Sequence, residues 1–540
     1  MYKLILNGNP AYRWTEYDDS AFMGYIYNSC EKIHREHDAI KVLNKHLLNG
    51  KNIVEEIWNY DGMFSFIRFF SDKVIIVTDI VNFFSVYYLW HENQWIISDN
   101  WQSLVDYKSK FEFNEQASIG FLSGGFVCGN KTLDKDIKKT QAADFITLNY
   151  NGTATHQRHF DFIPKNFTNA NYSKLIDEAE SVFLETGKEI ITFLNNRTAV
   201  VPLSGGFDSR LIVCLLKKFD YKDVICFTYG KKTKEVEISK NVADLFGYKW
   251  FFIDYEEVDY NNYLDDPSFV TYAQNYSNGY SMFFLQEYFA MRELVKNNLI
   301  PENSVFLPGH SGDFMGGSYV EKTAATTSSP KKLAEYLLKK YFFFKKVSGI
   351  NKKFLLSEIQ ETLESYPETN SFSKKYNPYV EDWDIKEKLA KFIFRSSYVF
   401  THFGFEHIYA LWNRKTTAFF RQIPYEMRSC KKLYNEVLIE KFFKPLNAYF
   451  NANELSRVST TYMKYQLLKD SLRNIFPWQF VLKVMIKHDW LNYYVFTKEM
   501  EKSLRDKNYK PLKRYKMFTA IICRWYIDLV MTTNKRTSQF

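Results

Sequence analysis

The order of hydrophobic and polar residues divides the chain into two regions with different periods. Over about the first 160 residues, short apolar or alternating runs are separated by polar pairs, a pattern typical of strands joined by hairpins. These runs span 61–70, 73–80, 83–90, 94–99 and 145–160, and the last contains Asn151-Gly152, a strong signal for a tight hairpin turn. The pattern predicts an antiparallel β or α+β domain.

From residue 172 the period becomes helical. A helix is expected over 172–196, and apolar strand candidates at 198–203, 223–230 and 249–255 then alternate with helical segments at 210–219 and 234–247. Strands that alternate with helices predict a parallel, doubly wound sheet. Beyond residue 270 the pattern is mostly helical, and 322–380 has the composition of an insertion. The polar joint at 163–172 favours two domains, 1–165 and 166–540.

Composition excludes several classes of protein. Of the 540 residues, 46% are hydrophobic and 25% are charged, which is ordinary for a globular protein. The net charge of +9 is a mild excess, and the Lys pairs between 331 and 353 fit solvated helix faces, so nucleic acid is not an expected partner. The six cysteines form no C-x-x-C pair, which leaves zinc and thioredoxin chemistry without support. We recognise no signal peptide and no bilayer-spanning stretch, and therefore expect a reducing cytoplasmic setting.

The most informative segment is Ser204-Gly205-Gly206-Phe207-Asp208-Ser209, which joins a predicted buried strand to a predicted helix. Ligands bind at such strand ends in α/β folds, and glycine-rich loops at helix starts present backbone amides to phosphate. The serine hydroxyls could contact phosphate oxygens, and Asp208 could hold Mg²⁺. The simpler alternative is a tight turn in which Asp208 or Ser209 caps the helix. No Walker loop is present in the sequence.

This S-G-G-x-D-S loop resembles the pyrophosphate-binding loop of the N-type ATP pyrophosphatases, which cleave ATP to AMP and pyrophosphate. A second segment, Gly309 to Tyr319, is similar to the G-x-G-x-D-E-x-x-G-G-Y element of the asparagine synthetase family. Gly404-Phe405-Glu406 and the segment 430–438 resemble later elements of the same family, in the same order. The resemblance implies an ATP-dependent, amide-forming ligase with an N-type ATP pyrophosphatase domain over 166–540.

The first half resembles the glutaminase domain of that family, an Ntn-hydrolase-like antiparallel β/α fold, through segments 61–66, 77–89 and 120–139. Working domains of this type use an N-terminal Cys as nucleophile. Here residues 1 and 2 are Met and Tyr, and the first cysteine is Cys30. We therefore expect a degenerate, scaffold-only domain over 1–165. The nitrogen donor would then be free ammonia or an amine.

The resemblance also assigns candidate site residues. Asp208 and Asp313 would bind Mg²⁺, and backbone groups of Leu203 and Tyr229-Gly230 would flank adenine. The phosphate cradle would comprise Ser204, Gly205, Gly206, Asp208, Ser209 and Gly309. His310 would be a general base or a structural histidine, and Glu406 would orient that base or be a buried hydrogen-bonding acid. Candidates for a catalytic cation are Lys431, Lys432, Lys464 and, as an outsider, Arg457, and Lys432 is the choice made from the sequence.

These assignments lead to an expected reaction with ATP and Mg²⁺ as cofactors. The enzyme would adenylate a small carboxylate, release pyrophosphate, and pass the acyl group to ammonia or an amine. A uronic acid or related sugar in surface-glycan synthesis is the preferred acceptor class. Amide formation in peptide or secondary-metabolite synthesis, and a catalytically inactive ATP-binding scaffold, are the alternatives. A tRNA-modifying pyrophosphatase is disfavoured by the missing cysteine pairs, and a homodimer is left open.

Overall fold

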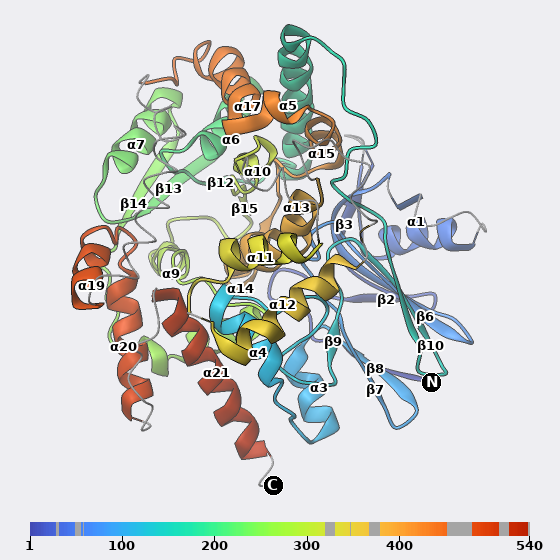
Figure 1. Ribbon diagram of the computed structural model, residues 1–540. Coiled ribbons are helices and arrows are strands. Elements are labelled where there is room, and N and C mark those ends of the chain that lie inside the picture. Colours follow the sequence, from blue (N-terminus) through green and yellow to red (C-terminus); the bar gives the residue numbers. More distant parts are fainter. Residues whose placement is uncertain are drawn as a thin grey trace.

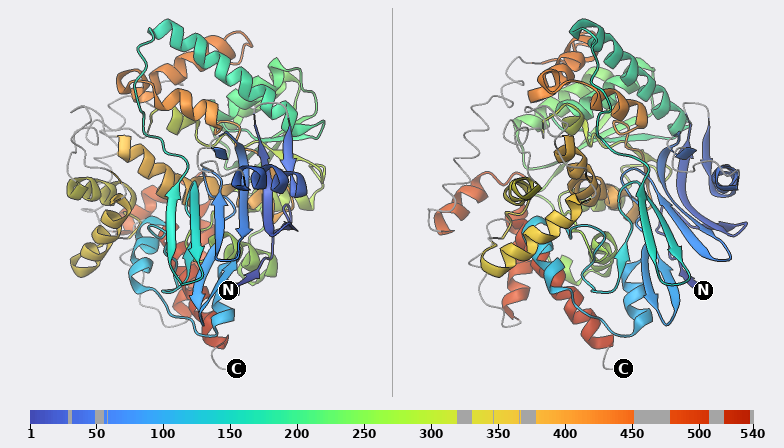
Figure 2. Two further views of the ribbon diagram at one scale, coloured as in Figure 1. Left: turned by 90° about the vertical axis from the view of Figure 1, so that its right-hand side faces the viewer. Right: turned by 45° about the vertical axis from the view of Figure 1, so that its right-hand side comes forward.

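The structure is a computed structural model of the 540-residue chain. It describes residues 1–28, 32–48, 56–57, 59–318, 330–345, 347–364, 366, 378–450, 478–506 and 518–537. Figures 1 and 2 place the β-rich first half along one side of the molecule and a second, smaller sheet with its helices beside it.

The first half contains two sheets. A seven-stranded antiparallel sheet has the order β11-β10-β6-β5-β3-β2, with β4 paired to β3, and a four-stranded sheet has the order β1-β8-β7-β9. The strands are β1 (Tyr2–Ile5), β2 (Thr15–Tyr17), β3 (Ser20–Tyr27), β4 (Ile33–Arg35), β5 (Asp61–Phe69), β6 (Lys73–Thr78), β7 (Tyr87–His91), β8 (Gln94–Ser98), β9 (Lys138–Lys139), β10 (Asp144–Asn149) and β11 (Ala154–Arg158). The predicted antiparallel character is confirmed, except that β1 runs parallel to β8.

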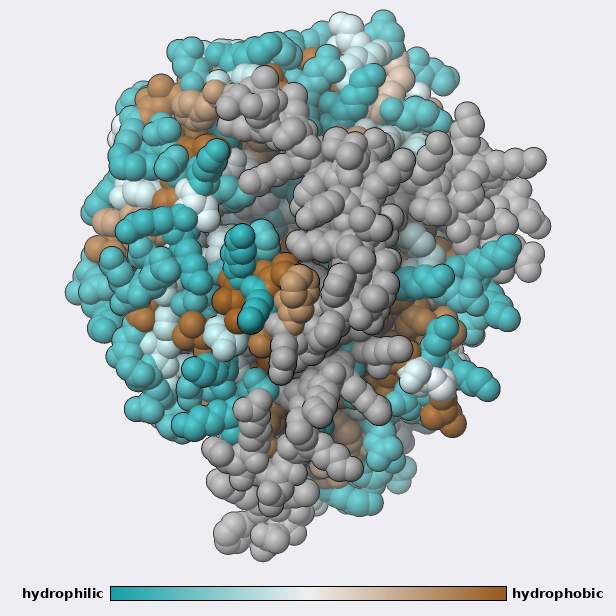
Figure 3. Space-filling model, turned by 60° about the vertical axis from the view of Figure 1, so that its left-hand side comes forward, coloured by the Kyte–Doolittle hydropathy of each residue, from teal (hydrophilic) through white to brown (hydrophobic). Residues whose placement is uncertain are grey.

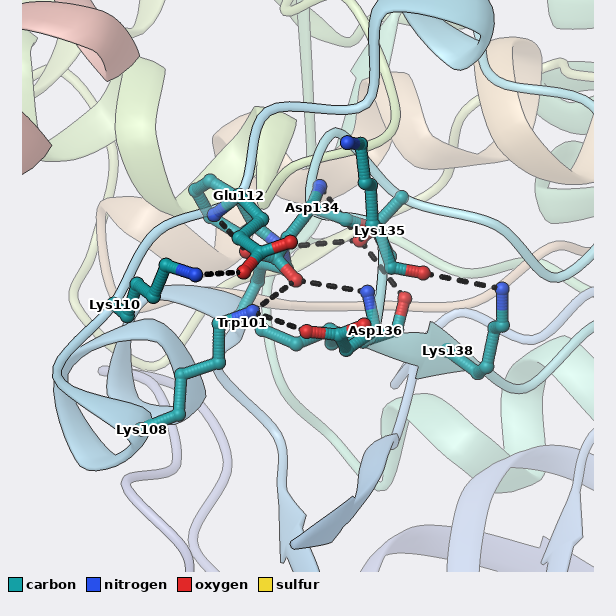
Figure 4. Close-up of polar contacts among 10 residues, drawn as sticks. Trp101, Lys108, Lys110, Glu112, Asp134, Lys135, Asp136 and Lys138 are labelled. Atoms are coloured by element: carbon teal, nitrogen blue, oxygen red, sulfur yellow. Dashed lines mark hydrogen bonds and ion pairs between the residues drawn. The ribbon is translucent and has the colours of Figure 1, made fainter.

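Three helices accompany these sheets: α1 (Glu36–Leu48), α3 (Trp101–Lys108) and α4 (Glu115–Gly124). A cluster of charged residues, shown in Figure 4, fixes the loop before β9 against α3. The Lys108 ammonium, almost fully buried, donates to Asp134 at 2.8 Å and to Asp136 at 2.7 Å. Because this lysine is paired twice, its burial is compensated, and the loop is held by buried charge as well as by packing.

The second half is organised around a five-stranded parallel sheet with the order β14-β13-β12-β15-β16. Its strands are β12 (Ala199–Pro202), β13 (Val224–Gly230), β14 (Lys249–Asp254), β15 (Val305–Phe306) and β16 (Glu406–His407). Helices α6 (Phe207–Lys218) and α7 (Lys234–Phe246) connect β12 to β13 and β13 to β14, and α5 (Tyr172–Leu194) precedes them. The predicted alternation of strands and helices in a mixed α/β fold is confirmed.

The remaining chain is mostly helical, as expected. Its α-helices are α8 (Pro267–Ser277), α9 (Tyr288–Lys296), α10 (Gly312–Met315), α11 (Pro330–Tyr341), α12 (Gly349–Leu363), α13 (Pro378–Trp383), α14 (Tyr398–His402), α15 (Arg414–Arg421), α16 (Tyr425–Arg428), α17 (Lys432–Val437), α19 (Trp478–Lys487), α20 (Tyr493–Asp506) and α21 (Phe518–Thr537). Between α13 and α14 lie the π-helix η4 (Asp384–Ile393) and the 3₁₀ helix η5 (Phe394–Ser397). Helices α11 and α12 share a hydrophobic core with Phe126 and Cys128 of the first half.

One hydrophobic core runs through both halves. Polar contacts also cross between them: the Tyr25 hydroxyl donates to the His407 carbonyl, and the Arg414 backbone amide donates to the Asp61 carboxylate at 2.8 Å. The predicted boundary at 165/166 falls in the connection between β11 and α5, and the division into two domains stays a prediction.

The surface view in Figure 3 shows mainly hydrophilic residues, with hydrophobic ones in small groups. Among the helices that the structure describes, none combines the length and the apolar character needed to cross a bilayer.

Candidate active site

The loop after β12 forms a closed turn that ends at the start of α6. The Leu203 amide still donates to the Phe227 carbonyl, so the sheet continues to the edge of the loop. The Ser209 hydroxyl then accepts from the Ser204 amide and contacts the Ser204 hydroxyl, both at 3.1 Å. Gly205 must be glycine here, because an added Cβ would lie 2.9 Å from the Cα of Glu235 at the start of α7.

Helix α6 carries no side-chain cap, since its N-cap residue is Gly206. This contradicts the simpler interpretation from the sequence, in which Asp208 or Ser209 caps the helix. The first amides of this 12-residue helix are therefore not taken up by a capping side chain. Uncapped amides at a helix start, together with the helix dipole, favour an anionic ligand.

The Asp208 carboxylate turns away from its own helix and meets the second motif. One oxygen accepts the Asp313 amide and the other accepts the Tyr434 hydroxyl, both at 2.9 Å. Gly312 makes this approach possible, because an added Cβ would lie 2.2 Å from the Tyr434 hydroxyl oxygen. The structure thus brings together Asp208 and Asp313, as the sequence predicted, although 105 positions separate them.

The charges of this cluster are incompletely balanced. Burial raises the pKa of Asp208 to about 7, and the nearby Asp313 carboxylate adds to the rise. The Asp313 side chain is 57% exposed and is paired with the Lys431 ammonium. An additional positive charge between the two aspartates would be favourable here.

Two adjacent carboxylates fit Mg²⁺, which prefers oxygen ligands. Among the described residues, no three His, Cys, Asp or Glu side chains gather in an arrangement that could hold a metal ion. A magnesium ion at Asp208 and Asp313 would therefore complete its shell with phosphate and water oxygens, as Mg²⁺ commonly does.

The structure places the two neighbouring lysine candidates differently. Lys431 pairs with Asp313, whereas the Lys432 ammonium lies 4.9 Å from the centre of the Tyr172 ring, toward α5. Cys430 and Lys431 have φ of 57° and 59°, so the chain kinks immediately before α17 and sends consecutive side chains in different directions. Lys464 and Arg457 lie outside the described residues.

His310 precedes a strained residue at the start of α10. Its Nε2 is 3.1 Å from the Ser396 hydroxyl, and its Nδ1 is shielded from solvent without a hydrogen-bond partner among the described residues. Burial lowers the pKa of His310 to about 4, so the ring is neutral at pH 7. Ser311 has φ of 81°, which is unusual for a residue with a side chain and often marks a functional site.

Glu406 is bound by two arginines rather than by His310. Its carboxylate accepts from Arg35 at 2.5 and 3.0 Å and from Arg197 at 2.6 Å. Burial raises the pKa of Glu406, but the two guanidinium groups outweigh this and hold it below its usual value. These contacts fit the second interpretation from the sequence, a hydrogen-bonding acid inside the protein.

The proposed adenine residues lie at the ends of β12 and β13. The Leu203 amide is used in the sheet, and its carbonyl accepts the Thr228 hydroxyl at 2.7 Å. The Tyr229 side chain bonds to Glu287 and stacks on Tyr255, so only its backbone is left for a ligand.

Sequence reasoning missed a residue next to these strand ends, Trp490. Its carbonyl accepts the Lys231 amide at 2.8 Å, and a Cβ on Gly230 would lie 2.9 Å from the same oxygen. Trp490 lies in the turn between α19 and α20, in the last part of the chain, where the sequence resembled no known pattern. Tyr434 and Ser311 were missed too, and only their positions within recognised motifs could have drawn attention to them.

The asparagine synthase family model matches residues 195–442, the part of the chain that holds the loop, both aspartates and Lys431. No curated protein matches the chain. Similar solved structures include an NH3-dependent NAD synthetase from Campylobacter jejuni subsp. jejuni NCTC 11168 in complex with the nitrate ion, with 16% identity over 37% of this chain and 99% of that chain, at a TM-score of 0.18.

A glutamine phosphoribosylpyrophosphate amidotransferase from B. subtilis, complexed with ADP and GMP, is similar with 9% identity over 46% of this chain and 75% of that chain, also at a TM-score of 0.18. Such TM-scores are too low to support an argument about function. The family match, in contrast, covers the candidate site. Residues 195–442 therefore form an asparagine synthase domain, and through this domain the protein is an ATP-dependent carbon–nitrogen ligase.

Proposed function

We propose that the protein adenylates a small carboxylate and converts it to an amide with ammonia or an amine. The observation that carries this proposal is the meeting of Asp208, Asp313 and Lys431 beside the uncapped start of α6. In the first step a carboxylate oxygen attacks the α-phosphorus of ATP and pyrophosphate leaves. In the second step the nitrogen attacks the acyl carbon, AMP leaves, and a proton is released.

Each residue has a distinct task in this scheme. The amides of the 204–209 loop bind the phosphates, and Lys431 places a cation where negative charge develops. A magnesium ion held by Asp208 and Asp313 would supply charge neutralisation on the phosphate oxygens. His310, neutral at pH 7, accepts a hydrogen bond or the released proton from the incoming nitrogen.

The first half serves as a scaffold in this proposal. Residues of its sheets, including Arg35 and Asp61, bind Glu406 and Arg414 of the second half. Of the cysteines that the structure describes, Cys128, Cys214, Cys226 and Cys523 are buried and Cys430 is exposed, and Cys30 lies outside the described residues. Ammonia or an amine from solution would then be the nucleophile.

The acceptor class stays open between two settings. A uronic acid or related sugar of a surface glycan is preferred, and an acid in peptide or secondary-metabolite synthesis is the alternative. A catalytically inactive ATP-binding scaffold is the third candidate.

The test is magnesium-dependent release of pyrophosphate from ATP, measured with a panel of uronic acids, amino acids and hydroxy acids in the presence of ammonium. Asp208→Ala and Asp313→Ala should abolish release, whereas Asp72→Ala, at an exposed position far from the loop, should not change it. ATP binding without turnover over the whole panel would instead support the scaffold.

A further inference from the structure

A cavity of about 360 Å³ lies away from the candidate active site, between the two halves of the chain. The first half lines it with residues 7–9, 84–85 and the start of α3, and the second half with the end of α8, η5, the first residue of α14, and α21. Helices α3 and α21 are tied at its edge by a hydrogen bond from the Gln102 amide to Asn534 at 2.7 Å. This volume lies within the range of small-molecule sites.

A buried cation lines the cavity without an acidic partner. Arg395 is 5% exposed, and its guanidinium donates to the carbonyls of Phe83, Asn275 and Tyr276 at 2.7 to 3.1 Å. Three of its five N–H groups are used in this way. Among the residues that the structure describes, no carboxylate forms an ion pair with Arg395, so a full positive charge is compensated only by neutral dipoles. A buried charge in this state is costly and attracts an anion.

Hydroxyl and amide donors with unused capacity surround this cation. Tyr398, 7% exposed, stacks on the guanidinium at 4.3 Å, and its hydroxyl bonds to no other described residue. Burial raises the pKa of Tyr398 to about 12, so the hydroxyl keeps its proton and acts as a donor. The Tyr526 hydroxyl accepts the Gly279 amide, which leaves its own proton free, and Asn275 uses only its Oδ1.

Two acids line the cavity, Asp99 and Asp106. The exposed Asp106 accepts from the Gln102 side-chain amide at 2.9 Å, and Asp99 is bonded more fully. Its two oxygens accept from the amides of Asn7 and Gly8, from the Asn7 side chain and from the Trp14 indole, at 2.7 to 3.1 Å. These four donors use its acceptor capacity and offset its charge. Around Arg395 the open groups are therefore the hydroxyl and amide donors and the cation itself, which is the arrangement that recognises acceptor-rich anions.

We infer that this cavity is a binding site for a small organic anion, whose carboxylate or phosphate oxygens are held by Arg395 and Tyr398. The inference does not rest on the proposed ligase function. On η5, the residue after Arg395 is Ser396, which contacts His310 on its other side, so the two sites are separated by the thickness of one helical segment.

The chain offers a matched pair of variants to test the site. Tyr398→Phe removes a hydroxyl from a residue that lines the cavity, whereas Tyr276→Phe removes a buried hydroxyl that is equally without a partner, beside the same arginine but outside the lining. Isothermal titration with phosphate and with succinate should show a site in the wild-type protein and in Tyr276→Phe, with affinity about tenfold or more weaker in Tyr398→Phe. The stronger of the two probes identifies the anionic group that the site prefers.

Because the 204–209 loop would also attract phosphate, location must be measured directly. Crystals soaked in selenate should give an anomalous peak between Arg395 and Tyr398, present in Tyr276→Phe and lost in Tyr398→Phe. A peak at the loop alone, equal affinities for the two variants, or glycerol binding as well as succinate would overturn the inference.

Discussion

Two clusters in this protein each combine acids with cations, but they differ in how completely their charges are balanced. At Glu406, one carboxylate meets Arg35 and Arg197, every carboxylate oxygen is bonded, and its pKa is held below the usual value. At Asp208 and Asp313, two carboxylates share one lysine, and burial with like charge raises the pKa of Asp208 to about 7. The first cluster joins the two halves of the chain, and the second has room for further positive charge.

The difference follows from the number of charges on each side. Two cations around one acid leave a positive surplus, which further contacts of the guanidinium groups help to offset. Arg197 also donates to the carbonyls of Phe193 and Leu194, and Arg35 lies over the Tyr25 ring. Two acids around one cation leave a negative surplus beside the 204–209 loop. A ligand or a metal ion can supply the counter-charge that the protein alone does not provide.

The largest effect is expected when each of two neighbouring lysines is replaced in turn by Met. Lys431→Met should lower the rate of pyrophosphate release about 10²- to 10³-fold, since it removes a fixed cation from developing charge. Lys432→Met, one residue away but directed at Tyr172, should change the rate less than about threefold. Steady-state rates at saturating ATP measure both. Equal losses in the two variants would show that the site does not distinguish them.

Breaking the satisfied cluster should affect stability instead. Glu406→Gln leaves two partly buried arginines without a counter-charge, so the free energy of unfolding should fall by about 2–3 kcal/mol, less than for a fully buried pair. Urea unfolding measures this change. Asp177→Asn, which removes an exposed partner of Lys441, is the control and should cost below about 1 kcal/mol. A normal stability with lost activity would place Glu406 in the chemistry.

The sequence predicts those parts of the fold and of the clusters that are marked by residues close together in the chain. The strands β12, β13 and β14 were predicted because each is a continuous apolar run bounded by turns, a signal carried by a few residues. Asp208 and Asp313 were paired because each stands in a motif of its own. Arg35 and Arg197 could not be assigned to Glu406, because nothing near them in the sequence marks a partner hundreds of positions away.

The choice between Lys431 and Lys432 could not be made from the sequence for a different reason, and it stays a prediction. Both residues stand in one recognised segment, and only the positive φ of Cys430 and Lys431 decides which side chain reaches Asp313. The parallel strand β1 was also missed, since its four residues, which include Lys3, are too few to show a period, and its pairing with β8 joins chain segments about 90 residues apart. Backbone kinks and distant strand pairs are tertiary properties that a local pattern does not contain.

A third acid, Glu189, has only one distant cation near its carboxylate and so extends the comparison. It accepts from the Asn413 amide, its nearest ammonium, on Lys415, is 4.0 Å away, and burial raises its pKa to about 8. The folded protein therefore keeps this proton to a higher pH than the unfolded chain, and the free energy of unfolding falls as pH rises from about 4.5 to 8.

Glu189→Gln should remove this loss and stabilise the protein by about 1–2 kcal/mol at pH 8, with little gain at pH 4. Thermal unfolding at the two pH values measures the effect. Glu185→Gln, which removes a half-exposed partner of the same Lys415, is the control for the loss of a contact with that lysine. A destabilised Glu189→Gln at pH 8 would mean that the Lys415 contact outweighs burial.

The smallest expected effect belongs to His310. With its pKa near 4, the ring is already neutral across pH 6–8 and is a weak base, so His310→Ala should slow amide formation only about tenfold. Because the folded pKa lies below the unfolded value, the stability tied to the neutral ring is lost as pH falls from about 6.5 through 4. The pH–rate profile should therefore show no step from this residue between pH 6 and 8.

His402→Ala is the control for effects of folding. It removes a histidine whose pKa burial also lowers to about 4 but which lies beside Tyr272. A step near pH 6.5 that disappears in His310→Ala alone would show that the ring titrates during turnover, and would make His310 an acid as well as an acceptor.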